Sequence, residues 1–410
     1  MSLDHEHIKR GENEMKKTLI LVMATLLLVM CCIGCASTPA GTAPSSEVPA
    51  ASSGAQTAPA TEGAAPAPEA ASAEPAAGDF LSTYITGKAI KADGTPLKVG
   101  INVAELKSEF IIMAQDYAVM LLEEAGAEVS VTNANNSVDT QMNQLNDFIE
   151  MGVDVIIVQP ADSEALAPAI KQINDANIPV ICINRSVFGE GIFVDLAIGA
   201  DDQVMGQMAA DYMLNLANGT DAKVATMQGT LATANASKRA EGFQEILDQN
   251  PSMQNISDRP CDWDSETAMA ATTDVLTANP DLFGIFSHSD CMLPGIIAAL
   301  TQSSKLAPVG EEGHVVVIAV DGAPNALDYV RQGYLDATIE QSSPMMATVA
   351  VKAILTKVMN GIPLTGETVN CEPTLITAEN VDDASLWGNF SIAGEVWPRT
   401  EEVWNTYLLD

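Results

Sequence analysis

Basic residues are scarce in this chain of 410 residues. It carries 19 Lys and Arg against 54 Asp and Glu, which gives a formal net charge of −35 at pH 7. The excess negative charge is spread along the sequence, and it would repel nucleic acid, anionic lipid headgroups and other polyanions. We therefore expect no nucleic-acid partner and no polyanionic ligand.

The sequence also lacks the motifs of nucleotide-binding and hydrolytic enzymes. No Gly-x-Gly-x-x-Gly follows a strand, and neither a Gly-x-x-x-x-Gly-Lys-Ser/Thr loop nor a Gly-x-Ser-x-Gly elbow occurs. The paired carboxylates that glycoside hydrolysis usually needs are not evident. A lone histidine such as His288 is expected to be a hydrogen-bonded structural residue. The sequence therefore predicts no catalytic residue, no cofactor and no metal site.

The N-terminal region has the pattern of an export signal. Met15-Lys16-Lys17 is basic, and the apolar run over 18–30 is shorter than the roughly 20 residues that span a bilayer. Cys32-Ile33-Gly34-Cys35 resembles a bacterial lipobox, in which cleavage after Gly34 leaves Cys35 as the lipidated N-terminus. We predict a lipoprotein signal peptide over 15–35 and a protein exported and lipid-anchored to the bacterial cell membrane. An uncleaved hydrophobic anchor is the alternative.

Residues 36–78 consist mainly of Ala, Pro, Ser, Thr, Gly and Glu and contain no aromatic residue. Such a segment cannot fill a core, so it is predicted to be a disordered tether. A flexible chain of this length has an end-to-end distance of roughly 35–40 Å, which would hold a globular head away from a membrane. An O-glycosylated stalk or a simple spacer would have the same composition.

Four cysteines follow the predicted cleavage site, and none of them is paired at metal-ligand spacing. They are expected to be buried free thiols, although an exported protein can also form disulfides. These residues are Cys182, Cys261, Cys291 and Cys371.

From Leu97 onward, short apolar runs alternate with segments of helical period. The run 155–158 is continuous in Val and Ile, as expected of a parallel strand that is buried on both faces. Phe110, Met113 and Tyr117 belong to an apolar stripe at helical spacing. The alternation restarts after Asp201, so we predict an α/β fold of two doubly wound parallel-sheet lobes. Ligands bind such sheets at the carboxyl ends of the strands, which places a site between the lobes.

Several motifs in this region resemble those of the type I periplasmic binding proteins, in the branch that contains the ribose-binding protein. The resemblance extends over about residues 97–360 and excludes the signal, the tether and the last forty or so residues. The order and spacing of the motifs make it specific. The motifs are Asp154–Ser163, Asn177–Val180, Arg239–Phe243, Val320–Pro324 and Ala337–Gln341.

The resemblance implies two lobes that are joined by three hinge crossings and close on a small ligand. The crossings would lie near Gly199, Gln341 and Cys371. The N-terminal lobe would then be 97–199 plus 342–370, and the C-terminal lobe, with the tail, 200–341 plus 371–410. The implied function is the extracytoplasmic binding subunit of an ABC importer, with membrane permease subunits as partners. A protein that presents ligand to a chemoreceptor or histidine kinase is the alternative, and we expect a monomer.

The resemblance also implies the contacts in the ligand site. Phe110 and Trp263 would sandwich a sugar ring, because aromatic faces supply apolar contact with little loss of entropy. Arg185 would donate to hydroxyl or ring oxygens, and Asp321 would accept from hydroxyls. Gln341 would contact both the ligand and the hinge. The alternatives are core filling for the aromatic residues, a surface ion pair for Arg185, a helix cap for Asp321 and a hinge spacer for Gln341.

The chain departs from the ribose-binding pattern at several ligand positions. Ser108, Asn184, Ser237 and Ser289 stand where that pattern has other polar groups, and the serines at 237 and 289 replace an arginine and an asparagine. A pocket with fewer and shorter hydrogen-bond partners rejects a ligand that was matched to the longer ones. We therefore predict a neutral sugar or polyol other than ribose, with water filling the gaps.

Overall fold

The computed structural model describes residues 80–393 and 395–407, all of which fall in one compact unit. The predicted signal peptide with Cys35, and the predicted tether over 36–78, lie outside the described residues. No helix within 80–393 and 395–407 is long and apolar enough to cross a membrane.

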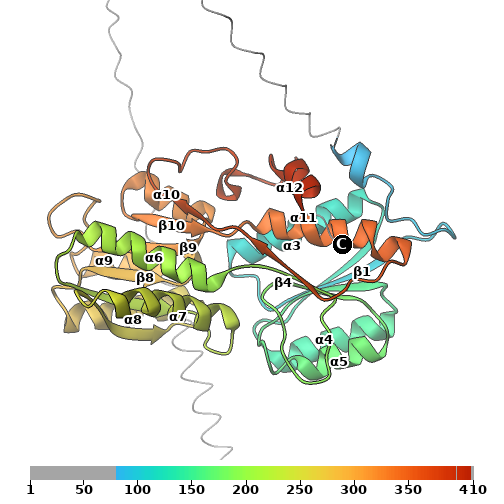
Figure 1. Ribbon diagram of the computed structural model, residues 1–410, viewed down its shortest axis with the longest axis horizontal. Helices are drawn as coiled ribbons and strands as arrows, with labels where there is room; N and C mark the ends of the chain where they lie inside the picture. Colours follow the sequence, from blue (N-terminus) through green and yellow to red (C-terminus); the bar gives the residue numbers. More distant parts are fainter. Residues whose placement is uncertain (1–79, 394, 408–410) are drawn as a thin grey trace, which may run out of the picture. The chain divides into compact units, whose positions relative to one another are not determined.

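The N-terminal lobe is built on a six-stranded parallel sheet with the order β11-β5-β4-β3-β1-β2. Its core lies on both faces of this sheet, with α3 and α11 on one face and α4 and α5 on the other (Figure 1). The elements are β1 (Lys98–Val103), α3 (Glu109–Glu124), β2 (Glu128–Asn133), α4 (Val138–Met151), β3 (Val155–Gln159), α5 (Ala167–Asp175), β4 (Val180–Asn184), β5 (Leu196–Ala200), α11 (Ser343–Thr356), η3 (Val358–Asn360) and β11 (Glu367–Cys371).

The C-terminal lobe repeats this architecture with the strand order β12-β10-β9-β8-β6-β7. All its strands are parallel except the edge strand β12, which pairs antiparallel with β10. One face carries α6 and α7, and the other carries α8, α9 and α10. The elements are α6 (Asp202–Ala217), β6 (Ala222–Gln228), α7 (Ala234–Gln249), β7 (Met253–Pro260), α8 (Ser265–Ala278), β8 (Gly284–Ser287), η2 (Asp290–Met292), α9 (Leu293–Gln302), β9 (Val316–Asp321), α10 (Pro324–Gln332), β10 (Ala337–Glu340) and β12 (Thr374–Ile376). The predicted fold class, two doubly wound α/β lobes, is confirmed.

The chain passes between the two sheets at three points along this part of the sequence. It leaves the first sheet after β5, returns between β10 and α11, and crosses again between β11 and β12. Gly199 lies in β5, Gln341 directly follows β10, and Cys371 is the last residue of β11. The residues named from the sequence as crossing points therefore lie at the three connections.

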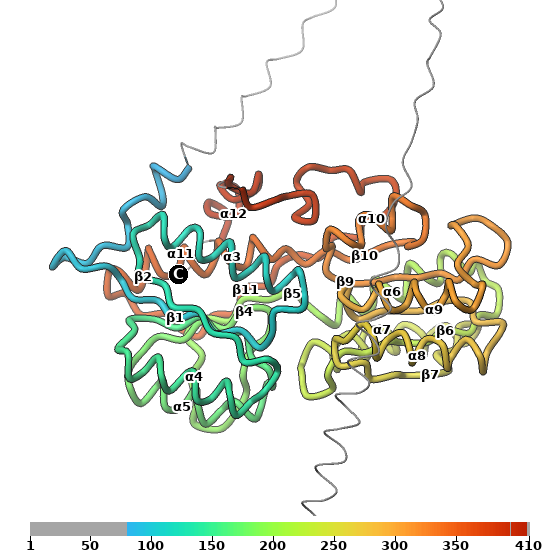
Figure 2. The backbone as a smooth tube through the Cα atoms, turned by 180° about the vertical axis from the view of Figure 1, so that it is seen from behind, coloured from blue at the N-terminus to red at the C-terminus, as the bar shows by residue number. Residues whose placement is uncertain are grey.

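The C-terminal tail adds a further connection and corrects one predicted boundary. After β12, Leu386 packs in the core of the C-terminal lobe, whereas Trp397 and Trp404 pack in the core of the N-terminal lobe. The last helix of the described residues, α12 (Thr400–Thr406), lies near α11 (Figure 2). The Lys352 ammonium of α11 donates to the carbonyls of Trp404 and Tyr407. The segment 371–410, predicted as the rest of the C-terminal lobe with the tail, is therefore divided between the lobes, because the tail buries Trp397 and Trp404 against the N-terminal lobe.

The N-terminal lobe also begins earlier than the predicted residue 97. A short helical turn, η1 (Leu81–Ile85), precedes β1, and Phe80 and Ile85 are buried in the lobe core. The ring of Phe80 contacts Trp404 edge-to-face at 5.6 Å between centroids. This start was missed because its apolar residues pack against the distant end of the chain.

Candidate functional site

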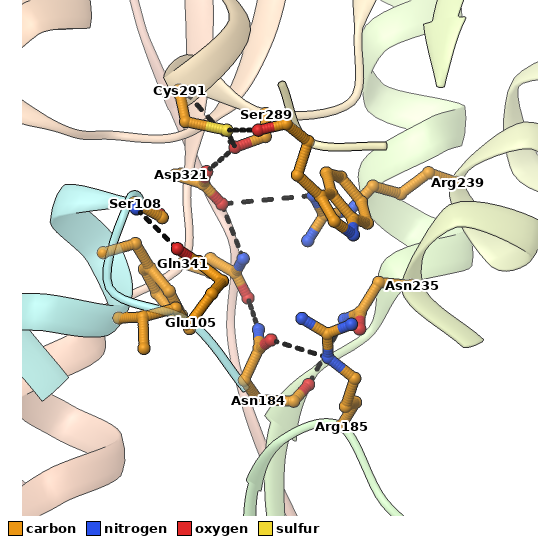
Figure 3. Close-up of a pocket in the computed structure, with 13 residues that line it drawn as sticks. Glu105, Ser108, Asn184, Arg185, Asn235, Arg239, Ser289, Cys291, Asp321 and Gln341 are labelled. Atoms are coloured by element: carbon orange, nitrogen blue, oxygen red, sulfur yellow. Dashed lines mark hydrogen bonds and ion pairs between the residues drawn. The ribbon is translucent and has the colours of Figure 1, made fainter. Parts of the chain in front are cut away.

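A cavity lies between the lobes, at the carboxyl ends of the strands (Figure 3). Both sheets contribute side chains to it from the loops that follow their strands. The lining residues are Glu105, Ser108, Phe110, Ile111, Asn184, Arg185, Asn235, Arg239, Trp263, Ser289, Cys291, Asp321 and Gln341.

The lobes contact each other around this cavity. The Asn235 amide nitrogen, from α7, donates to the main-chain oxygen of Asn184 at 3.3 Å, and the Asn184 amide donates to Gln341 Oε1 at 3.4 Å. At the rim, Lys107 Nζ lies 3.4 Å from Asp264 Oδ2. The structure therefore has the two lobes closed over the cavity.

Asp321 is the buried acceptor at the end of β9. Its carboxylate accepts from Ser289 Oγ at 2.5 Å and from Gln341 Nε2 at 2.7 Å, and Arg239 Nη1 lies 4.0 Å away. Burial raises the pKa of the Asp321 carboxyl, although Arg239 and these hydrogen bonds oppose the rise. Neighbouring Asp290 is also buried, and burial together with the Asp321 charge raises its pKa well above the usual range. Figure 3 shows Asp321 joined through Gln341 and Asn184 to the other lobe.

The two arginines of the cavity are held differently. Arg239 is 2% exposed; its Nε donates to Asp202 Oδ1 at 2.8 Å and its Nη1 donates to the carbonyl of His288. Arg185 Nε donates to Asn184 Oδ1 at 3.3 Å, and burial lowers the Arg185 pKa to about 10, which leaves it charged at neutral pH. Both guanidinium groups therefore present fixed donors.

Trp263 occupies one wall of the cavity because Gly229 leaves room for it. A Cβ at Gly229 would lie 2.0 Å from the Trp263 ring. The guanidinium carbons of Arg185 and Arg239 lie 6.0 and 5.8 Å from the indole centroid, within range of cation–π attraction. Asp262 and Trp263 both have positive φ, 53° and 57°, so the surrounding contacts must hold this loop against local strain.

Two buried polar atoms of the lining have no hydrogen-bond partner within the described part of the chain. These are Asn235 Oδ1, an acceptor, and Trp263 Nε1, a donor. An unpaired buried polar group costs about 1–3 kcal/mol, so a ligand that pairs with these atoms is favoured. A hydroxyl group can donate to the first and accept from the second.

Eight of the nine residues predicted for ligand contact line this cavity: Ser108, Phe110, Asn184, Arg185, Trp263, Ser289, Asp321 and Gln341. Phe110 also belongs to the core of the N-terminal lobe.

Ser237 is the predicted site residue that the structure places elsewhere. It is exposed on α7, its hydroxyl donates to Ala234 O at 3.1 Å, and it borders a separate depression. Asn235 and Arg239 lie four residues apart, on the helix face toward the cavity. Ser237, midway between them, therefore points away, and its assignment to the ligand site is corrected.

Five lining residues were not among the predicted ligand contacts: Glu105, Ile111, Asn235, Arg239 and Cys291. Arg239 was noted only as part of a motif. Its spacing of four residues from Asn235 places the two on one helix face, and this could have identified both as site residues. Glu105 accepts hydrogen bonds from the main-chain amides of Lys107 and Ser108, so it shapes the loop after β1. Cys291 carried no signal of its own.

His288 does not line the cavity, and of the cysteines only Cys291 does. The expectation that the His288 ring is hydrogen-bonded is wrong, because neither ring nitrogen has a partner among the described residues. Burial and nearby Arg239 lower the pKa of His288 well below its usual range, so the ring is neutral. The four cysteines of the described residues are free thiols, three of them buried and Cys291 partly so. No group of three or more potential metal ligands occurs among residues 80–393 and 395–407.

Comparison with known proteins places these features in a family. A model of the periplasmic binding protein domain matches residues 99–361, which is more than half of the chain. The ribose import binding protein of Bacillus subtilis is 28% identical over 255 residues, 62% of this chain and 79% of the relative. The xylitol-binding protein of Mycolicibacterium smegmatis is 25% identical over 305 residues, 72% of this chain and 80% of the relative.

A solved structure, the Caulobacter myo-inositol-binding protein, superposes with a TM-score of 0.66 at 24% identity, covering 72% of this chain and 97% of the other. This likeness supports the fold. Both curated relatives are binding proteins and not enzymes. The chain therefore belongs to the periplasmic binding protein family, whose members act outside the cytoplasm.

Proposed function

We propose that the chain is the solute-binding subunit of an ABC importer, and that it binds a neutral sugar or polyol in the cavity between its lobes. The observation that carries this proposal is the unpaired polar pair, Asn235 Oδ1 and Trp263 Nε1. These atoms need a donor and an acceptor, and each hydroxyl of a sugar or polyol supplies both.

The charges of the cavity favour a neutral ligand. The lining carries two carboxylates, Glu105 and Asp321, and two guanidinium groups, Arg185 and Arg239. Arg239 is already paired with Asp202, and the two lining carboxylates balance the two guanidinium groups in number. A charged ligand would leave one of these groups unbalanced in a buried site.

The polarity of the lining narrows the ligand class further. Trp263 supplies an aromatic surface for the C–H face of a sugar or polyol. Ser108 and Ser289 are short, so bound water would complete their contacts, and a polyol, a pyranose or a deoxy sugar is favoured over ribose.

The remaining parts of the proposal concern delivery. Lipidation at Cys35 would anchor the protein, as a monomer, on the outer side of the cell membrane, where permease subunits would receive the ligand. The relatives' names refer to import and binding, which favours transport over presentation of ligand to a chemoreceptor or histidine kinase.

Thermal unfolding of the full chain tests the binding proposal. The panel is D-ribose, xylitol, myo-inositol, D-allose and D-fucose, with amino acids and nucleosides as other classes. A ligand at a hundred times its dissociation constant adds about 2.7 kcal/mol of stability. The shift should disappear in Trp263→Ala, become smaller in Asp321→Asn and persist in Ser237→Ala. A shift with amino acids or nucleosides alone, or with nothing, contradicts the proposal.

A further inference from the structure

Trp387 lies in the C-terminal tail, beyond the residues that match the family model, and is fully buried. We propose that Trp387 is a positioning residue for the ligand site: it holds Asp321 and Phe110 in the geometry that binds ligand. The inference rests on the proposed function, because the effect of replacing Trp387 is measured as a change in affinity for a sugar or polyol.

The first contact fixes the main chain of Asp321. The indole Nε1 of Trp387 donates to the main-chain carbonyl oxygen of Asp321 at 2.7 Å. The main-chain N–H of Gln341 donates to the same oxygen at 3.3 Å. Asp321 has φ 131°, a backbone conformation that side-chain-bearing residues rarely adopt. Such a conformation persists only where its surroundings hold it. Without the indole donor, the peptide after Asp321 could rotate and take the carboxylate out of place.

The second contact fixes the neighbouring strand. The Trp387 main-chain amide donates to Glu340 Oε1 at 3.0 Å, and Glu340 lies opposite Asp321 in the β10–β9 register. The next residue, Gln341, donates from Nε2 to the Asp321 carboxylate. The tail backbone also lies very close to Gly322, the residue after Asp321. A Cβ added to Gly388 would be only 2.3 Å from the Gly322 carbonyl oxygen.

The third contact reaches the opposite lobe. The Trp387 ring meets Phe110 edge-to-face, with 6.1 Å between centroids and 73° between planes. Phe110 and Asp321 both line the cavity but come from different lobes. Trp387 therefore supports two walls of the site from behind. The tail that carries it passes from one lobe to the other (Figure 2).

Trp397 offers a matched control in the same tail. It is 1% exposed, and its Nε1 donates to the carbonyl of Ser385 at 3.1 Å. Its amide donates to Tyr117 Oη, and its ring lies against Arg399. None of these three partners lines the cavity. Replacing Trp397 with Phe removes the same donor from an equally buried indole without touching the site.

The affinity test uses Trp387→Phe and Trp397→Phe in the full chain, titrated calorimetrically with the five sugars and polyols of the panel. Loss of the donor to a buried carbonyl should weaken binding about tenfold in Trp387→Phe and by less than about twofold in Trp397→Phe. Gly388→Ala, which keeps the indole but displaces the tail, should act in the same direction. Equal affinities in wild type and Trp387→Phe would overturn the proposal.

A double-mutant cycle separates positioning from general destabilisation. If Trp387 acts through Asp321, then Trp387→Phe should cost less than about twofold in affinity when Asp321→Asn is already present. Additive losses would overturn the proposal, because a merely structural role predicts the same cost in both backgrounds.

Hydrogen exchange gives a reading that needs no ligand. Gly322 and Ala323 are the two residues after Asp321. The main-chain amide of Gly322 donates to Thr338 Oγ1, and that of Ala323 donates to the Asp290 carboxylate. Their exchange should become about tenfold faster in Trp387→Phe and stay unchanged in Trp397→Phe. Unchanged exchange in Trp387→Phe overturns the positioning role. If no panel compound binds the wild type, the proposed function fails while this measurement still decides the role of Trp387.

Discussion

Glu340 is a buried carboxyl that should make the stability of this protein depend on pH in an unusual direction. It ends β10 with 4% of its surface exposed, and its Oε1 accepts the Trp387 amide. Burial raises the pKa of Glu340 from 4.5 to about 7, more than the Trp387 hydrogen bond and the Arg399 charge lower it. The perturbation is Glu340→Gln, which keeps the acceptor oxygen and removes the titration.

The sign follows from the two pKa values. Because the folded-state pKa lies above the unfolded value, the stability linked to Glu340 is fully present below pH 4.5 and is lost as pH rises through 7. At about 1.4 kcal/mol per pKa unit, the loss above pH 7 is roughly 3 kcal/mol. Glu340→Gln should therefore be the more stable protein at pH 8 and lose most of that advantage at pH 5.

Differential scanning calorimetry at the two pH values measures the difference. For a folded part of this size, roughly 3 kcal/mol corresponds to a Tm increase of about 4–5 °C at pH 8. Glu190→Gln, at an exposed loop position, is the control and should give no comparable change. A Tm difference between Glu340→Gln and wild type that is the same at pH 5 and pH 8 would refute the reasoning.

Three further predictions concern the cavity wall, the rim and the anchor. Gly229→Ala should push Trp263 into the cavity and weaken ligand binding at least about tenfold by calorimetry; unchanged affinity would contradict the packing argument. Lys107→Ala should shift Tm by about 1 °C or less, because its ion pair with Asp264 is largely exposed, and a larger loss would mean that the pair closes the lobes. Cys35→Ser should move the protein from the membrane fraction to the soluble fraction of a bacterial host, and continued membrane association would exclude lipidation there.

Among the strands predicted from the sequence, those with continuous apolar runs are the most clearly indicated. Every residue of β3 is buried, as the run at 155–158 indicates for a strand covered on both faces. The edge strand β7 was missed because its residues, from Met253 to Pro260, are mostly polar and half exposed. The short strands β5, β11 and β12 were also missed, since none combines an apolar run with turn residues on both sides.

Site residues at the ends of strands could be predicted from the fold. Those whose position depends on the orientation of a helix, or on contacts with the C-terminal tail, could not. Asn184 and Asp321 end parallel strands, so their place at the sheet edge follows from the fold. Ser237 was misplaced because motif position alone does not give the phase of α7, which turns Arg239 inward instead. The contacts of Trp387 join residues far apart in sequence, and no local periodicity encodes them.

The central claim is that a neutral sugar or polyol binds between the lobes and pairs with the orphaned Asn235 Oδ1 and Trp263 Nε1. Two residues of one helix, Asn235 facing the cavity and Ser237 facing solvent, allow the most direct test. Isothermal titration of the full chain with the five panel compounds should show saturable binding of at least one, weakened at least about tenfold in Asn235→Ala and by less than about twofold in Ser237→Ala. Absence of binding, or equal effects of the two substitutions, would contradict the account.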